Sequence, residues 1–234
     1  MRRPTYSGRL EKSMNYKLIY TPDEIRQYIG SAGIVAFDFE TAPNDEWRNE
    51  SKAALDAHKA HIVGISLSVA EGSAVYVPLA HKIGKNAVLT DAILECLREM
   101  LFENPAIVKV AHNLSFEAMF LYALGIVVCE PCYDTIAAAQ LTLKSKFEFR
   151  DLHDSGLKLL STSLFGAEMP DFNTVTAGRH FDEMDPAEHE TLRYACADSD
   201  YTLRLYYKFN GWFAKNLPQH RDIVERVESP TAVY

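Results

Sequence analysis

Cysteine and long apolar runs are both scarce in this sequence of 234 residues. Its four cysteines are Cys96, Cys129, Cys132 and Cys196, and only the pair at 129 and 132 has the spacing of a redox or zinc motif. No second pair and no spaced histidine pair completes a zinc site, so we interpret all four as reduced core thiols. No apolar run approaches the length of a membrane span, and the first residues lack the apolar core of a signal peptide. These absences predict a cytoplasmic protein with no membrane partner.

Positive charge is also in deficit, with 24 Lys and Arg against 32 Asp and Glu and a net charge of −8. This balance argues against tight autonomous binding to nucleic acid, because a basic face normally supplies that affinity. It leaves open an enzyme that holds metal ions with carboxylates and meets its substrate only briefly. The hydrophobic fraction of 47% is ordinary for a globular protein, and the length suits one domain, with or without a small appendage.

The hydrophobic pattern alternates between strand and helix signals. A capping box at Thr21 and Glu24 with Pro22 at the first helical position predicts a helix that ends near Gly30. A long polar loop is expected over 166–185. Strands are expected at 16–20, 34–41, 62–69, 74–77, 107–111 and, in two short pieces, 126–128 and 132–133; the other helices are expected at 90–102, 114–124, 135–143, 152–164 and 186–213. The pattern predicts an α/β fold with a mixed sheet of about five strands flanked by helices.

The stretch Ile34–Thr41 carries the first chemical signal. It is a short apolar run that ends in Asp38-Phe39-Glu40, which is typical of a strand buried on both faces. Side chains two apart in a strand share one face, so Asp38 and Glu40 lie roughly 7 Å apart along the chain. Two carboxylates on a buried element repel each other, and a hard divalent cation with oxygen ligands relieves that repulsion. The alternative is a pair of carboxylates exposed to water just past a strand end.

Two further stretches place polar groups on helices. His112-Asn113-Leu114-Ser115-Phe116-Glu117 puts a carboxylate in the first turn of a helix that follows a buried strand. Tyr194-Ala195-Cys196-Ala197-Asp198 puts a hydroxyl and a carboxylate four residues apart on one helical face. Each has a structural alternative, since Glu117 suits a helix N-terminus and Tyr194 with Asp198 suits an exposed amphipathic face.

In order and spacing, the three stretches resemble the motifs of the DEDD superfamily of 3′–5′ exonucleases, in its tyrosine variant. The chain is most similar to the proofreading exonuclease domain of family A, polymerase I-like DNA polymerases, over about residues 33–207. Between the motifs, Tyr133-Asp134-Thr135 and Gly156-Leu157-Lys158-Leu159-Leu160 add to the likeness. The resemblance implies a ribonuclease H-like sheet. One residue departs from it: the second motif normally ends in Asp, and this chain has Glu117.

The resemblance also implies a role for each site residue. Two Mg²⁺ or Mn²⁺ ions would be held by Asp38, Glu40, Glu117 and Asp198, and Tyr194 would orient the attacking water. Substrate contacts would come from the Thr41 backbone amide, Asn113, Phe39 and Phe116, although core packing is the alternative for both phenylalanines. The expected substrate is single-stranded DNA, from whose 3′ end nucleotides are removed in proofreading.

The resemblance further implies how the chain is divided. Residues 1–16 are expected to be an extension, 17–215 the exonuclease domain, and 216–234 the start of a connection to a fused or associated polymerase domain. Two other functions stay open at this point. One is a ribonuclease D-like exonuclease that removes nucleotides from RNA 3′ ends, and the other is an inactive docking module that keeps the fold without the metals.

Overall fold

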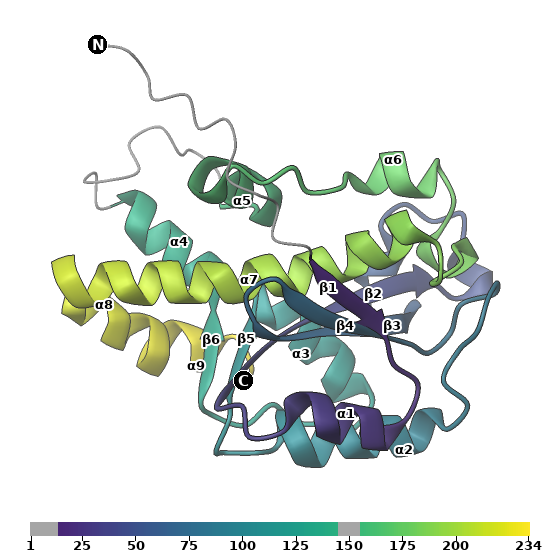
Figure 1. Cartoon of the computed structure of the whole chain (residues 1–234), viewed down its shortest axis with the longest axis horizontal. Coiled ribbons are helices and arrows are strands. Elements are labelled where there is room, and N and C mark those ends of the chain that lie inside the picture. The colour runs from purple at the N-terminus through teal and green to yellow at the C-terminus, as the bar shows by residue number, and fades with distance from the viewer. Residues whose placement is uncertain (1–13, 145–154) are drawn as a thin grey trace, which may run out of the picture.

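The computed structural model describes residues 14–144 and 155–234, and within them the chain forms one mixed sheet covered by helices on both faces (Figure 1). The strands are β1 (Asn15–Leu18), β2 (Ile34–Pro43), β3 (Ala60–Ala70), β4 (Ser73–Pro78), β5 (Val108–Ala111) and β6 (Cys132–Asp134). Their order is β1-β4-β3-β2-β5-β6. β3 runs antiparallel to β2 and β4, and the other neighbours are parallel. The predicted α/β class is confirmed, with six strands in the described residues rather than about five.

The helices follow most of the predicted spans. They are α1 (Pro22–Ile29), α2 (Thr90–Leu97), α3 (Leu114–Ala123), α4 (Thr135–Lys144), α5 (Leu157–Phe165), α6 (Phe172–Thr176), α7 (His189–Asn216), α8 (Pro218–Ile223) and α9 (Ser229–Thr231). Short turns lie at η1 (Asp45–Trp47), η2 (Ala53–Leu55) and η4 (Phe181–Glu183), and π-helical turns at η3 (Arg98–Phe102) and η5 (Val224–Glu228). The capping box predicted for α1 is present, with both reciprocal hydrogen bonds between Thr21 and Glu24.

Three local predictions need correction. The expected strand at 126–128 does not form, because the chain pairs with β5 only from Cys132 onward, opposite Lys109. The helix expected from residue 152 begins at Leu157, since Gly156 is extended, while residues 152–154 lie outside the described part of the chain. The loop expected at 166–185 contains α6 and η4.

The central strand β2 divides its side chains between two cores. Phe37 and Phe39 point to the layer that contains α1, α2 and α3, where they join one buried apolar cluster. Ala36 and Ala42 belong to clusters on the other face, which is covered by α7. Strand geometry therefore aims Asp38 and Glu40 at α7, which crosses the sheet in Figure 1. The fold brings the first and third motifs together in this way.

The C-terminal residues fold back onto the far edge of the sheet. Ser229 is buried, and its hydroxyl accepts a hydrogen bond from the backbone N–H of Asp134 in β6 at 2.8 Å. Val224 is also buried in the cluster beneath α7. The described residues hold no helix long and apolar enough to cross a membrane.

Candidate metal centre

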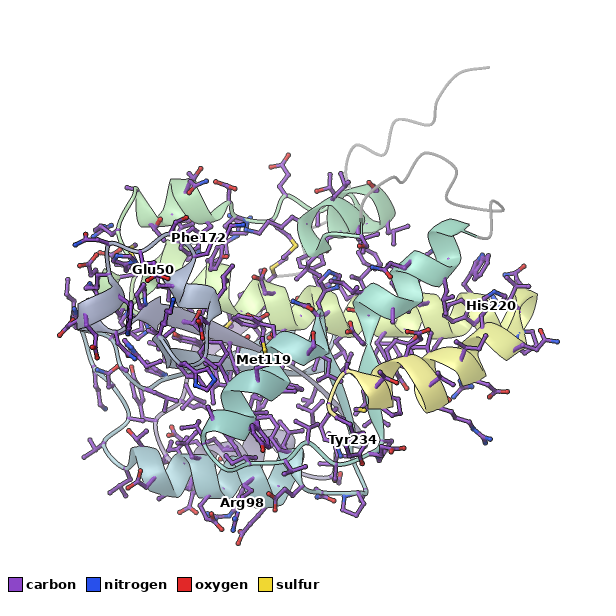
Figure 2. The ribbon with its side chains drawn as sticks, turned by 180° about the vertical axis from the view of Figure 1, so that it is seen from behind. Glu50, Arg98, Met119, Phe172, His220 and Tyr234 are labelled. Atoms are coloured by element: carbon purple, nitrogen blue, oxygen red, sulfur yellow. The ribbon has the colours of Figure 1, made fainter. Side chains whose placement is uncertain are left out.

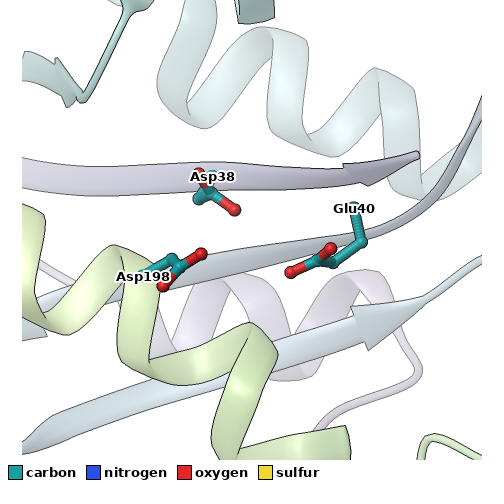
Figure 3. Close-up of side chains that lie close together, drawn as sticks. All are labelled: Asp38, Glu40 and Asp198. Atoms are coloured by element: carbon teal, nitrogen blue, oxygen red, sulfur yellow. The ribbon is translucent and has the colours of Figure 1, made fainter. Parts of the chain in front are cut away.

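Three carboxylates meet between β2 and α7. Asp38 and Glu40 come from the strand and Asp198 from the helix, and one oxygen of each lies within 4.8 Å of the others (Figure 3). Glu40 is 7% exposed, while Asp38 and Asp198 are partly buried. A bulge between Glu40 and Thr41 shifts the pairing of β2 with β3 directly after Glu40. The strand periodicity that predicted a shared face for Asp38 and Glu40 agrees with this arrangement.

Within residues 14–144 and 155–234, the carboxylates of the cluster are only partly paired. Buried oxygens of Glu40 (Oε1) and Asp198 (Oδ1) have no hydrogen-bond partner in the described chain. Burial and then the neighbouring carboxylates raise the pKa of Asp38 and of Glu40 well above their usual range. Burial alone raises the pKa of Asp198 to about 6. Unpaired, buried carboxylate oxygens are what a divalent cation requires, so these residues fit a Mg²⁺ or Mn²⁺ site.

Tyr194 and Lys158 flank the cluster. Tyr194 is 7% exposed, and burial followed by the charges of Glu40 and Asp198 raises the pKa of its hydroxyl far above the usual value. The Lys158 ammonium on α5 lies 4.5 Å from the centre of the Tyr194 ring. Its positive charge lowers the pKa of Asp38, Glu40 and Asp198 and so opposes part of the effect of burial. The hydroxyl thus stays protonated beside carboxylates whose charge Lys158 partly balances.

Glu117 lies next to this cluster but is not part of it. It is 2% exposed on the first turn of α3, and its Oε2 atom has no hydrogen-bond partner in the described chain. Burial and then the charge of Asp38 raise its pKa well above the usual range. Of the three carboxylates in the cluster, Asp38 is the one whose charge adds to this rise. Like the oxygens of the cluster, Glu117 Oε2 is an unpaired, buried oxygen of the kind that suits a divalent cation.

The start of α3 is fixed by Asp134. Its carboxylate accepts hydrogen bonds from the backbone N–H groups of Asn113 and Leu114, both at 3.1 Å. Asn113 itself has a φ of 80°, in the left-handed region that asparagine tolerates. This anchor holds the first turn, and with it Glu117, at the edge of the site.

The residues predicted to contact substrate are spread around the centre. Thr41 follows Glu40 directly, and its hydroxyl donates to the carbonyl of Ala54 at 2.7 Å. Asn113 is exposed at the start of α3, and Phe116 is half-buried with its ring 5.0 Å from that of Phe120. Phe39 is 5% exposed on the opposite face of β2, where it packs in the core, as the alternative to substrate binding expects. Its role in substrate binding stays a prediction without support from this position.

Sequence reasoning assigned no role to Lys158 or Asp134. Both lay in stretches that contributed to the family likeness, but no periodicity places a side chain of α5 above one of α7. A partial signal for Asp134 was available: an Asp directly before a helix is a frequent N-cap, and Asp134 accepts a hydrogen bond from the backbone N–H of Ile136 at 2.8 Å, but this does not predict its bonds to the start of α3. Phe172 was also missed: its ring lies 5.9 Å from Tyr194 and is 39% exposed on α6 (Figure 2).

Comparison with known proteins identifies relatives of this chain. A family model described as 3′–5′ exonuclease matches residues 16–211. DNA polymerase I of Pseudomonas aeruginosa is 33% identical over 184 residues, which cover 75% of this chain and 18% of that protein. DNA polymerase I of Chloroflexus aurantiacus is 31% identical, with 72% of this chain and 17% of that protein covered. The chain thus spans less than a fifth of the length of these two relatives.

Solved structures share the fold at lower identity. Trypanosoma brucei RNase D superposes with a TM-score of 0.70 at 17% identity, covering 94% of this chain and 72% of that one. Brucella melitensis NrnC, solved bound to pGG, superposes with a TM-score of 0.61 at 18% identity, covering 94% and 90%. These likenesses establish a ribonuclease H-like exonuclease fold for the described chain.

Proposed function

We propose that this chain, which belongs to the 3′–5′ exonuclease family of the DEDD superfamily, hydrolyses the terminal phosphodiester bond at the 3′ end of single-stranded DNA. The observation that carries the proposal is the cluster of Asp38, Glu40 and Asp198, in which buried oxygens of Glu40 and Asp198 have no hydrogen-bond partner in the described chain. A packed core gains nothing from such a cluster, since unpaired buried carboxylates destabilise a fold. A cation site accounts for it.

Two divalent cations would be held by four carboxylates. Asp38, Glu40 and Asp198 would hold one ion, and Glu117 together with Asp38 would hold the other. Asp38 is assigned to both ions because it belongs to the cluster and its charge also adds to the raised pKa of Glu117. When bound, such a pair stabilises the charge on the attacking and leaving oxygens of an in-line displacement. Glu117 replaces the usual Asp of the family, and its extra methylene is compatible with direct contact or contact through a retained water.

Tyr194 would position the attacking water. Its buried hydroxyl stays protonated at physiological pH, because burial and the neighbouring carboxylates raise its pKa. It therefore suits a hydrogen-bonding role rather than that of a general base, as expected for the tyrosine variant of the superfamily. Thr41 through its backbone amide and Asn113 through its exposed side chain would contact the terminal nucleotide, and the half-buried Phe116 ring would support its base.

DNA is the substrate we favour, because the relatives recognised by sequence are DNA polymerase I proteins. The same relatives support the proposal that residues 216–234 lead toward a polymerase domain. RNA is the second candidate. It is supported by the fold likeness to RNase D and to NrnC, a protein of similar length that was solved with the dinucleotide pGG. Location in the cytoplasm stays a prediction from the sequence.

A degradation assay tests the reaction and the substrate together. Single-stranded DNA, RNA of the same sequence and pGG, each labelled at the 5′ end, are incubated with Mg²⁺, with Mn²⁺ or with EDTA. We expect shortening from the 3′ end of DNA with either metal, and none with EDTA or with the Asp38→Ala variant. Faster shortening of RNA or pGG favours the second candidate. If none of the three substrates is shortened with either metal, the proposal fails and the chain is an inactive docking module.

A further inference from the structure

A buried ion pair joins the two segments that no motif explains. These segments are residues 44–59, between β2 and β3, and residues 166–188, between α5 and α7. The Asp182 carboxylate in η4 is fully buried and accepts two parallel hydrogen bonds from the Arg48 guanidinium, both at 2.8 Å. The backbone N–H of Lys82 donates to the Asp182 carbonyl at 2.6 Å, and its ammonium lies 3.6 Å from the carboxylate.

The same guanidinium reaches the strand that carries the carboxylates. Arg48 is 15% exposed and also donates to the carbonyl of Pro43, the last residue of β2, at 3.2 Å. It lies 3.1 Å from Glu183 as well. Burial of Asp182 is unfavourable by itself, but the hydrogen bonds and charge of Arg48 outweigh it and lower the pKa of the carboxyl group. The pair thus ties the end of β2 to the η4 turn in a bidentate geometry with little freedom.

The η4 turn places a ring directly behind Tyr194. Phe181, next to Asp182, is 1% exposed, and its ring centre lies 5.6 Å from that of Tyr194. Phe172, which is 39% exposed, and the half-buried Lys158 also contact the Tyr194 ring. Of these three side chains Phe181 is the buried one and belongs to the same core cluster as Tyr194, so its position limits where the Tyr194 ring can rest.

A second tether holds the turn from its other end. His81 is 5% exposed, and its Nδ1–H donates to the carbonyl of Met184 at 2.7 Å, since a carbonyl can only accept. Its Nε2 atom then accepts from the Tyr76 hydroxyl at 2.9 Å. The Tyr76 ring occupies the space above Gly64, where an added Cβ would meet the hydroxyl oxygen at 2.1 Å. Asp182 and Met184, one and three residues after Phe181, are thus both held in place.

We infer that Arg48 and Asp182 are positioning residues, which act through Phe181 to hold the Tyr194 hydroxyl where it orients the attacking water. The inference rests on the proposed role of Tyr194 and adds a function for two segments outside the three motifs. Neither charge of the pair belongs to the carboxylate cluster, so the pair affects the reaction through placement rather than through metal binding. Misplacement of a reacting group by about 1 Å can lower a rate by about 100-fold, so a small relaxation of the turn is enough to be measured.

The test removes the pair without leaving a buried charge unpaired. The double variant Arg48→Met/Asp182→Asn is compared with Phe181→Leu, which leaves the ion pair intact and removes only the ring behind Tyr194. We expect both to lower kcat on single-stranded DNA by about tenfold or more, with KM changed less than about twofold. Mn²⁺ binding, measured by isothermal titration calorimetry, should stay within about twofold of wild type.

Asp200→Asn is the matched control. Asp200 is the same kind of residue, fully buried and paired with Arg204 through two hydrogen bonds of 2.9 and 3.0 Å. It lies on α7, about 200° around the helix from Asp198, and faces β1 through Tyr16. We expect Asp200→Asn to lower the melting temperature as a buried pair should, while kcat stays near wild type below that temperature.

The decisive comparison repeats the pair variant and Phe181→Leu in a Tyr194→Phe background. With the hydroxyl gone, neither change should lower kcat by more than about twofold further, since there is nothing left to position. An equal loss in both backgrounds, or a loss in Asp200→Asn as large as in the pair variant, would overturn the inference. If Tyr194→Phe alone leaves kcat unchanged while Asp38→Ala is inactive, the inference fails and the exonuclease proposal stands. If both are fully active, the proposed function has failed.

Discussion

Replacing Asp198 with asparagine should stabilise the metal-free protein at alkaline pH. Burial raises the pKa of Asp198 to about 6 from an ordinary value of 3.8. A carboxyl whose pKa is raised in the folded state binds protons more tightly there than in the unfolded state. Its unfavourable effect on folding is therefore absent below about pH 3.8, grows as the pH rises to about 6, and is constant above that.

The magnitude follows from the two pKa values. A difference of about 2 pH units corresponds to about 3 kcal/mol at pH 8, where Asp198 is ionised in both states, and to about 1.6 kcal/mol at pH 5. Asparagine keeps the shape and removes the charge. In EDTA, the free energy of unfolding of Asp198→Asn should exceed that of wild type by up to these amounts, in urea titrations followed by circular dichroism.

Metal should remove this advantage. Mg²⁺ at about 100 times its dissociation constant stabilises a single-site protein by about 2.7 kcal/mol, and only the wild type keeps the full ligand set. The exposed Asp222 provides the control, since Asp222→Asn should stay within about 0.5 kcal/mol of wild type throughout. A metal-free Asp198→Asn protein that is less stable than wild type at pH 8 would refute the claim that the cluster is destabilised by its own charge.

Two further predictions concern the groups around the cluster. Tyr194→Phe keeps the ring and its packing, so it should lower kcat at least tenfold with little change in KM, as single-turnover kinetics can show; equal turnover would make Tyr194 a packing residue. Lys158→Met removes the positive charge that lowers the pKa of Asp38, Glu40 and Asp198, so the acidic limb of the pH–rate profile should move to higher pH; an unchanged limb would place Lys158 outside the site.

The parts of the site that sequence could predict were those set by local geometry. A period of two placed Asp38 and Glu40 on one face of β2, and a spacing of four placed Tyr194 and Asp198 on one face of α7. These are properties of single elements, which periodicity describes well.

The parts that sequence missed depend on contacts between distant elements. Arg48 and Asp182 are 134 residues apart, and each lies in a segment without regular periodicity. Lys158 reaches Tyr194 only because α5 packs beside α7, which no pattern within either helix encodes. The strand expected at 126–128 was wrong for a similar reason. Its apolar residues fit a buried strand, but the register of β6 on β5 starts at Cys132.

Glu117 gives the sharpest test of how many cations the site holds. Its Oε2 atom has no hydrogen-bond partner in the described chain, and the charge of Asp38 adds to the rise of its pKa, but it lies outside the group formed by Asp38, Glu40 and Asp198. A second cation between Glu117 and Asp38 would depend more on the negative charge of residue 117 than on the length of its side chain. Glu117→Asp should therefore stay active, whereas Glu117→Gln, which keeps the length and loses the charge, should lose most activity, as should Glu117→Ala.

Calorimetry distinguishes a Glu117 that holds a second cation from a Glu117 that only stabilises the start of α3. We expect wild type and Glu117→Asp to bind two Mn²⁺ ions, and Glu117→Gln and Glu117→Ala to bind one, because the three carboxylates between β2 and α7 remain intact. Glu117 also lies on the first turn of α3, where a negative charge favours the helix by about 0.3–1 kcal/mol, so each variant is assayed below its melting temperature. If Glu117→Ala binds two ions and shortens DNA as fast as wild type, Glu117 serves only the helix, and the site works with three carboxylates.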